Sequence, residues 1–293
     1  MTRSSWLAAH DLPAHHAAGQ PAGMTDYLLF PGGSIQVLAA MFLLVLCRVS
    51  ALVLAAPGLG ESTSPMVVRA GIAICITFAI LPIEHNALKD VSGQALHMPA
   101  RAIAIIAGEI LYGIFIGWLA RVISLALGIS MQFVAIFTGL ASVLQPDPDL
   151  GASSTAISHM AAFLVPVIFM SSGLYVLPLA AVTGSYTVFP PGHMPMVGDM
   201  ACSVTQVTAQ SFMLAFQLSA PFVLIGTLWP AMLGVLNRLL PSIQVYSMAM
   251  PAQLLGGVLL LAILIQVMSG VWQERTGDFL LSLPGIGAAT PHP

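Results

Sequence analysis

The sequence predicts an all-α, polytopic membrane protein. Between Leu150 and Gln273, Asp199 and Arg238 are the only charged side chains. Charged residues make up 6% of the chain and hydrophobic residues 58%, and the mean hydropathy is +0.94. Soluble domains carry about 25% charged residues. Lipid, or partner subunits that are equally apolar, must therefore replace water around most of the folded surface.

The length and composition bound the remaining choices. With 293 residues and no long polar block, the chain has room for roughly six or seven apolar helical segments of about 20 residues each in one domain. A net charge of -3 without a run of Lys or Arg gives no support for nucleic-acid binding. Cys47, Cys75 and Cys202 are isolated and are expected to be small buried hydrophobic residues. We expect no cofactor and no metal.

Both ends differ from the apolar centre. Residues 1–34 form a polar tract of small residues with His10, His15 and His16, which favours a disordered extension over a metal site or a signal peptide. Translation from Met24 would leave the first 23 residues outside the protein. We expect one helical domain over residues 35–280 and a flexible tail over residues 281–293.

In the first half of the chain, proline and polar residues separate three apolar segments. The first covers residues 35–56 and stops at Pro57-Gly58, and the second covers residues 66–81 and is closed by Pro82. A polar loop is expected over residues 83–99. The third segment, residues 101–127, carries a Gly113-xxx-Gly117 pair, which lets two helices approach closely.

The second half is broken more often. A mixed segment at 128–145 ends at a Pro-Asp-Pro-Asp break, and apolar segments follow at 156–182, 204–236 and 242–271. Residues 183–203 are expected to form turns, and the chain is expected to become a polar tail from Gln273. Several of these segments contain proline or glycine. Bent helices of this kind persist in a membrane only where neighbouring protein restores the lost hydrogen bonds.

Two ionisable residues lie inside apolar segments, Arg48 in the first and Glu109 in the third. A charge at that depth is costly unless it faces protein or water. A structural ion pair or a contact that holds the subunit in an assembly is the favoured interpretation, and a place in a transport path is the alternative.

Enzyme signatures are largely missing. The chain has no HExxH, no G-x-S-x-G, no Walker glycine loop and no CxxC, so hydrolase, metalloprotease, ATPase and thiol-redox chemistry are not expected. His85 and Asp90 share the H-x4-D spacing of membrane acyltransferases. Glu109 and His159 would be the coupling groups of a small-molecule secondary transporter, although no inverted repeat is visible.

Specific strings then narrow the interpretation. An apolar helix with an internal Arg48 is followed by Ala56-Pro57-Gly58, by a short helix that starts with Pro65-xxx-Arg69, and by the Glu109-xxx-Gly113-xxx-Gly117 pattern. Thr138-Gly139-Leu140-Ala141-Ser142 precedes Asp147-Pro148, and the run over residues 233–245 holds Asn237, Arg238 and Pro241 before Met250-Pro251. In this order the strings resemble the FliR family, the R subunit of the flagellar type III protein export gate, from about residue 36 to residue 280. The T subunit of virulence injectisomes shares the pattern.

The resemblance implies a non-catalytic subunit of the bacterial inner membrane and the flagellar basal body. It implies P and Q subunits and other membrane subunits of the export apparatus as partners, and unfolded flagellar proteins as the substrates that pass through a shared channel. A virulence-type export subunit is the alternative. Asn237, Arg238, Pro241 and Pro251 are the family signature residues.

The resemblance also implies a channel constriction in the central loop. The residues are Gly139, Leu140, Ala141, Ser142, Val143, Leu144, Asp147 and Pro148. The chain departs from the family here, because it has Met131-Gln132 and Ala135 where a Gly-Glu pair and a second glycine are usual, and it lacks phenylalanine near the loop. The seal is therefore expected to use Leu140, Val143, Leu144 or Met131.

Overall fold

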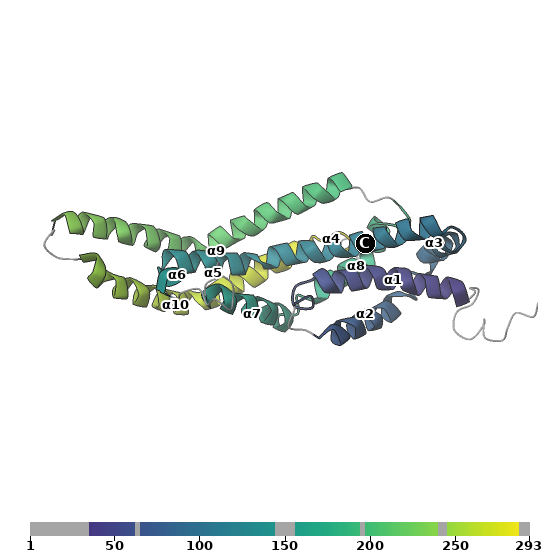
Figure 1. The fold of residues 1–293 in the computed structure, drawn as a ribbon, viewed down its shortest axis with the longest axis horizontal. Coiled ribbons are helices and arrows are strands. Elements are labelled where there is room, and N and C mark those ends of the chain that lie inside the picture. Colours follow the sequence, from purple (N-terminus) through teal and green to yellow (C-terminus); the bar gives the residue numbers. More distant parts are fainter. Residues whose placement is uncertain (1–34, 62–64, 144–155, 194–196, 240–244, 287–293) are drawn as a thin grey trace, which may run out of the picture.

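The computed structural model describes residues 35–61, 65–143, 156–193, 197–239 and 245–286. All regular secondary structure in these ranges is helical, as the sequence predicted (Figure 1). The helices are α1 (Ile35–Ala55), α2 (Met66–Ile80), α3 (His85–His97), α4 (Pro99–Ser124), α5 (Ala126–Phe137), α6 (Leu140–Val143), α7 (Ala156–Ser171), α8 (Val176–Val188), α9 (Val197–Leu239) and α10 (Val245–Leu281).

Within the described ranges, four helices are long and apolar enough to cross a membrane, or up to six if each of two bent pairs is one span. Only the upper count reaches the low end of the six or seven segments predicted, because α4 and α5 count as one 39-residue stretch, Pro99–Phe137. The separate segments expected at 101–127 and 128–145 correspond to α4 and α5, which meet at Leu125. The bent pairs are α2 with α3, at 101°, and α7 with α8, at 67°.

Three regions expected to be polar loops are partly helical. The loop predicted over 83–99 contains α3, the turns predicted over 183–203 contain the end of α8 and the start of α9, and α10 continues past Gln273 to Leu281. The cause in α10 is amphipathic spacing: Trp272, Thr276 and Leu280 are buried one turn apart while charged neighbours face outward. A search for purely apolar spans overlooks such helices.

The cysteines also differ from expectation. Cys75 and Cys202 are exposed and Cys47 is half-buried, and all three are free thiols. Their neighbours in sequence are apolar, but the helix faces that carry Cys75 and Cys202 are not covered by this chain. Apolar surroundings in sequence thus do not establish burial in a protein whose outer surface is itself apolar.

The helices α1 and α4 pack side by side through glycine. A Cβ atom at Gly113 would collide with the carbonyl oxygen of Arg48 and lie 2.8 Å from Cβ of Ala51, and one at Gly117 would lie 2.7 Å from Cβ of Ala55. These distances are shorter than real Cβ contacts, so only glycine permits this approach. The close packing predicted for the GxxxG pair is confirmed.

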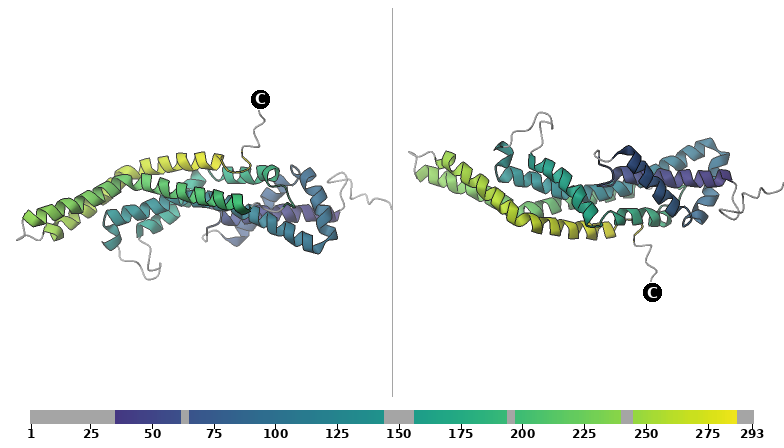
Figure 2. Two further views of the ribbon diagram at one scale, coloured as in Figure 1. Left: turned by 90° about the horizontal axis from the view of Figure 1, so that it is seen from above. Right: turned by 90° about the horizontal axis from the view of Figure 1, so that it is seen from below.

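The molecule is elongated (Figure 1). α1, α2, α3, α4 and α8 gather at one end, and the distal halves of α9 and α10 project from the other end as a hairpin (Figure 2). None of the described side chains over residues 223–239 or 248–267 is buried. α9 has 43 residues, roughly 65 Å at 1.5 Å per residue, about twice the thickness of the hydrocarbon core. Simple lipid-spanning rods do not require helices of this length.

Candidate functional site

The two buried charges form one ion pair inside the chain. Nε of Arg48 donates to Oε2 of Glu109 at 2.6 Å, and Nη2 donates to Oε1 at 3.1 Å. The relative exposure of the side chains is 0% for Arg48 and 1% for Glu109. Such a two-point contact fits the planar fork of the guanidinium and is the strong form of an ion pair.

The third helix of this site is α8. Nη1 of Arg48 donates to Oγ of Ser185 at 2.9 Å, and Nη2 donates to the backbone oxygen of Phe189 at 3.1 Å. The guanidinium carbon lies 4.0 Å from the ring centre of Tyr186 and 5.1 Å from that of Tyr112, a distance range for cation–π attraction. Arg48 therefore links α1 to α4 and α8 at a single buried point.

The burial of Arg48 and Glu109 limits the contacts that the ion pair can make. Both charged groups are satisfied by their own chain and are sealed from solvent, so neither can reach a partner subunit directly. The cost of a buried charge pointed to Arg48 and Glu109 in the sequence. Ser185, Tyr186 and Phe189 were missed, because they lie in the stretch 183–203 that was expected to form turns.

The predicted constriction begins where α5 ends. Thr138 donates its hydroxyl to the backbone oxygen of Val134 at 2.7 Å, and Gly139 has a positive φ of 81°. That backbone conformation favours glycine and turns the chain out of α5 into α6. This conformation explains why glycine occupies the middle position of the Thr138-Gly139-Leu140 string.

The end of α5 is held between the two helices of the hairpin. A Cβ atom at Gly226 of α9 would collide with the backbone oxygen of Phe137 and lie 2.6 Å from its Cβ atom. One at Gly257 of α10 would lie 2.7 Å from Cβ of Thr138, and one at Gly139 would lie 3.4 Å from Nε2 of Gln253. Gly226 and Gly257 give no distinct signal in the sequence, because glycine is common in apolar helices.

The structure places only part of the expected constriction. Leu140 has an exposure of 8% and Met131 of 3%, so two of the four expected sealing residues are covered by the chain itself. Ala141 is half-buried, and Ser142 and Val143 lie in α6. Leu144, Asp147 and Pro148 lie outside the described residues. Their role in a constriction stays a prediction.

The family signature residues lie elsewhere, at the distal part of the hairpin. Asn237 and Arg238 are exposed near the end of α9, and Pro251 is exposed in the first part of α10; Pro241 is outside the described residues. The chain's own helices do not cover the three described residues, so they are available to a partner.

The residues of the enzyme and transporter alternatives are spread over α3, α4 and α7. His85 and Asp90 both lie in α3, and His159 lies in α7, whereas Glu109 pairs with Arg48. Among the residues that the structure describes, no three His, Cys, Asp or Glu side chains form a group that could hold a metal ion.

Together, the long apolar helices and the closed ion pair define a polytopic helical membrane protein. The family model described as bacterial export proteins, family 1, matches residues 39–279. The chain belongs to this family, the FliR family, whose members are membrane components of the flagellar type III export apparatus and are not enzymes. It is a multi-pass membrane protein of that apparatus.

Curated relatives are similar in sequence to this chain over nearly their full length. The flagellar biosynthetic protein FliR of Caulobacter vibrioides is 28% identical over 81% of this chain and 93% of its own length. FliR of Escherichia coli is 24% identical over 84% of this chain and 92% of its own length, and FliR of Bacillus subtilis is 25% identical over 86% and 99%.

Proposed function

We propose that this chain forms part of the inner-membrane channel through which unfolded flagellar proteins are exported, together with P and Q subunits. The observation that carries the proposal is the turn at Gly139. It directs the chain out of α5 at the point where α5 is clamped between Gly226 and Gly257. The loop that starts there is thereby held on a rigid support.

The exposed hairpin supports the assembly part of the proposal. Its distal halves are mostly apolar and largely exposed, and they bear the signature residues Asn237, Arg238 and Pro251. A contiguous exposed apolar surface of this extent marks an interaction with protein or lipid. P and Q subunits packed along part of α9 and α10 would cover the length that exceeds a bilayer, and lipid would contact the rest.

In this function the loop closes the channel through apolar contacts and catalyses no reaction. A ring of soft apolar side chains can close around an extended chain whatever its sequence, and it excludes ions by dewetting when the channel is idle. Since Leu140 and Met131 are covered by the chain itself, we assign the seal to the residues after them, with Leu144 as the first candidate.

The test is the conductance of the reconstituted export complex in a planar bilayer. Leu144→Ala removes bulk from the proposed seal and should raise the idle ion conductance. Leu255→Ala makes the same change at an exposed position of α10 and should leave the conductance unchanged. Equal conductance of the wild-type and Leu144→Ala complexes would contradict the assignment.

A further inference from the structure

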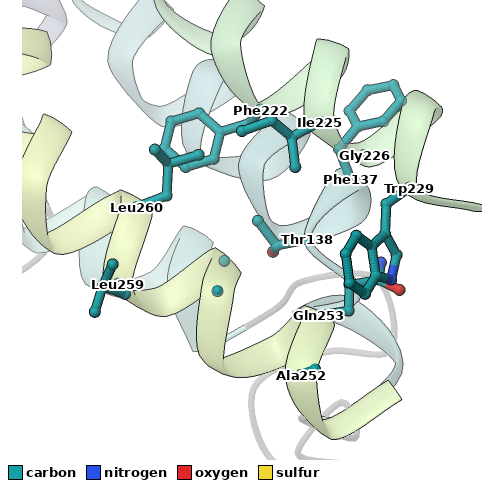
Figure 3. A pocket seen from close by; sticks show the side chains of 12 residues that line it. Phe137, Thr138, Phe222, Ile225, Gly226, Trp229, Ala252, Gln253, Leu259 and Leu260 are labelled. Carbon is teal, nitrogen blue, oxygen red and sulfur yellow. The ribbon is translucent and has the colours of Figure 1, made fainter. Parts of the chain in front are cut away.

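A pocket lies where the hairpin meets the end of α5. It encloses about 260 Å³ and is lined by Phe137 and Thr138 of α5, by α9 residues from Phe222 to Trp229, and by α10 residues from Ala252 to Leu260. Figure 3 shows Phe222, Ile225 and Trp229 on one side and Leu260 and Ala252 on the other, with Thr138 between the two helices. The volume is close to the lower end of small-ligand pockets, roughly 300–1,000 Å³.

The walls are apolar in chemistry. The hydroxyl of Thr138 is already bonded to the backbone oxygen of Val134. The glycines Gly226, Gly256 and Gly257 contribute no side chain, and the remaining lining is mostly aromatic or aliphatic. No charged residue lines the pocket. The amide of Gln253 and the indole N–H of Trp229 are the polar groups left on these walls, and the rest of the surface favours hydrocarbon.

The helices cannot close this space by moving together. Gly226 already presses on the backbone of Phe137, and Gly257 already presses on Thr138. A void left empty at this junction would deprive its lining of dispersion contacts. By contrast, Gly256 lines the pocket, and a Cβ atom there would meet nothing within 4 Å, so a side chain at this position has room to enter the open volume.

We propose that this pocket binds one acyl chain of a membrane phospholipid. The surface beside it is what hydrocarbon would contact: Leu224 and Leu228 of α9 and Leu255 of α10 are all more than half exposed. No charged residue occurs in the sequence from Leu239 to Gln273. An acyl chain can therefore pass from the outer face of the hairpin into the pocket without crossing a charged group.

The proposal is tested with the full-length chain in its purified export complex, reconstituted with a phosphatidylethanolamine that carries a diazirine in its acyl chain. After illumination, mass spectrometry locates the lipid adducts. Adducts are expected on Phe222, whose side chain is 1% exposed in this chain and lines the pocket, as well as on the outward-facing Leu224 and Leu255. Adducts on the outward-facing residues alone would show only surrounding lipid and would overturn the proposal.

A matched pair of variants sharpens the result. Gly256→Leu fills the open volume and should abolish the adducts on Phe222 while preserving those on Leu224. Gly234→Leu adds the same side chain at another α9–α10 glycine with open space around it and should change neither. Unchanged labelling of Phe222 in Gly256→Leu would overturn the proposal.

A neighbouring subunit is the other candidate occupant. A photoreactive amino acid at position 256 reports on it, and a cross-link from that position to a P or Q subunit would also overturn the proposal. The wild-type labelling requires no substitution, so the proposal stays falsifiable if a variant does not assemble. The lipid adducts do not depend on whether the chain lines the export channel, and the conductance test fails or succeeds separately.

Discussion

The strongest prediction concerns the buried ion pair. Removing one partner leaves the other charge buried without a counter-charge, which typically costs about 3–5 kcal/mol. Glu109→Leu strands a guanidinium that retains only Ser185 and the backbone oxygen of Phe189 as acceptors. Arg48→Met strands a carboxylate with no other cation bonded to it in the described structure. Each single variant should therefore lower the ratio of folded to unfolded chain by roughly two to four orders of magnitude.

The double variant Arg48→Met with Glu109→Leu removes both charges at once. Replacing a buried pair with apolar side chains of similar size is often neutral or stabilising. Here the backbone oxygen of Phe189 loses a donor, at a cost of about 1–3 kcal/mol, whereas Ser185 keeps its bond to the backbone oxygen of Val182. The double variant should thus be more stable than either single variant.

The assay is thermal unfolding of the purified export complex, combined with swimming motility in cells. We expect low complex yield and no motility for the single variants, and partial recovery of both for the double variant. Equal instability of all three variants would refute the coupling. A double variant that assembles normally but exports nothing would instead give the pair a direct role in transport.

Two further predictions use glycine contacts and matched controls in the same helices. Gly113→Ala inserts a methyl group 2.8 Å from Cβ of Ala51 and should destabilise the α1–α4 contact by about 1–3 kcal/mol, whereas Gly108→Ala, whose nearest neighbour lies 4.0 Å away, should leave the melting temperature unchanged or higher. Gly257→Ala should lower the melting temperature, because the added methyl group pushes α10 away from the end of α5. Gly234→Ala should not lower it, because the space around the new methyl group is open. Equal melting temperatures within either pair of variants would contradict these glycine contacts.

The sequence predicted the elements whose limits are marked by strong local signals. The bounds expected for α1 and α2 agree closely with the structure because Pro57-Gly58 and Pro82 stop two strongly apolar runs. The helix α3 was missed because its polar composition resembled a loop, although Leu88 and Ser92 are buried on one of its faces. Composition averaged over a window does not reveal such a face.

The candidate site was predictable only in part, for a related reason. The energetic cost of a buried charge pointed to Arg48 and Glu109, but the residues that complete their site lie 137 and 141 positions from Arg48. They follow the 67° bend between α7 and α8, where Gly173 has a positive φ of 77°. A property of single residues can identify a charge that needs partners, whereas the identity of the partners depends on the fold.

The two ends of the molecule differ in how much of their surface the chain's own helices cover. At one end, α1, α4 and α8 satisfy their buried charges and cover one another. At the other, the hairpin of α9 and α10 exposes apolar side chains over two long helices. The end of α5 is clamped to this second part, through Gly226 and Gly257. The loop that follows α5 is therefore carried by the part of the chain that must bind other molecules, so association of the hairpin with its neighbours would set the position of the proposed constriction.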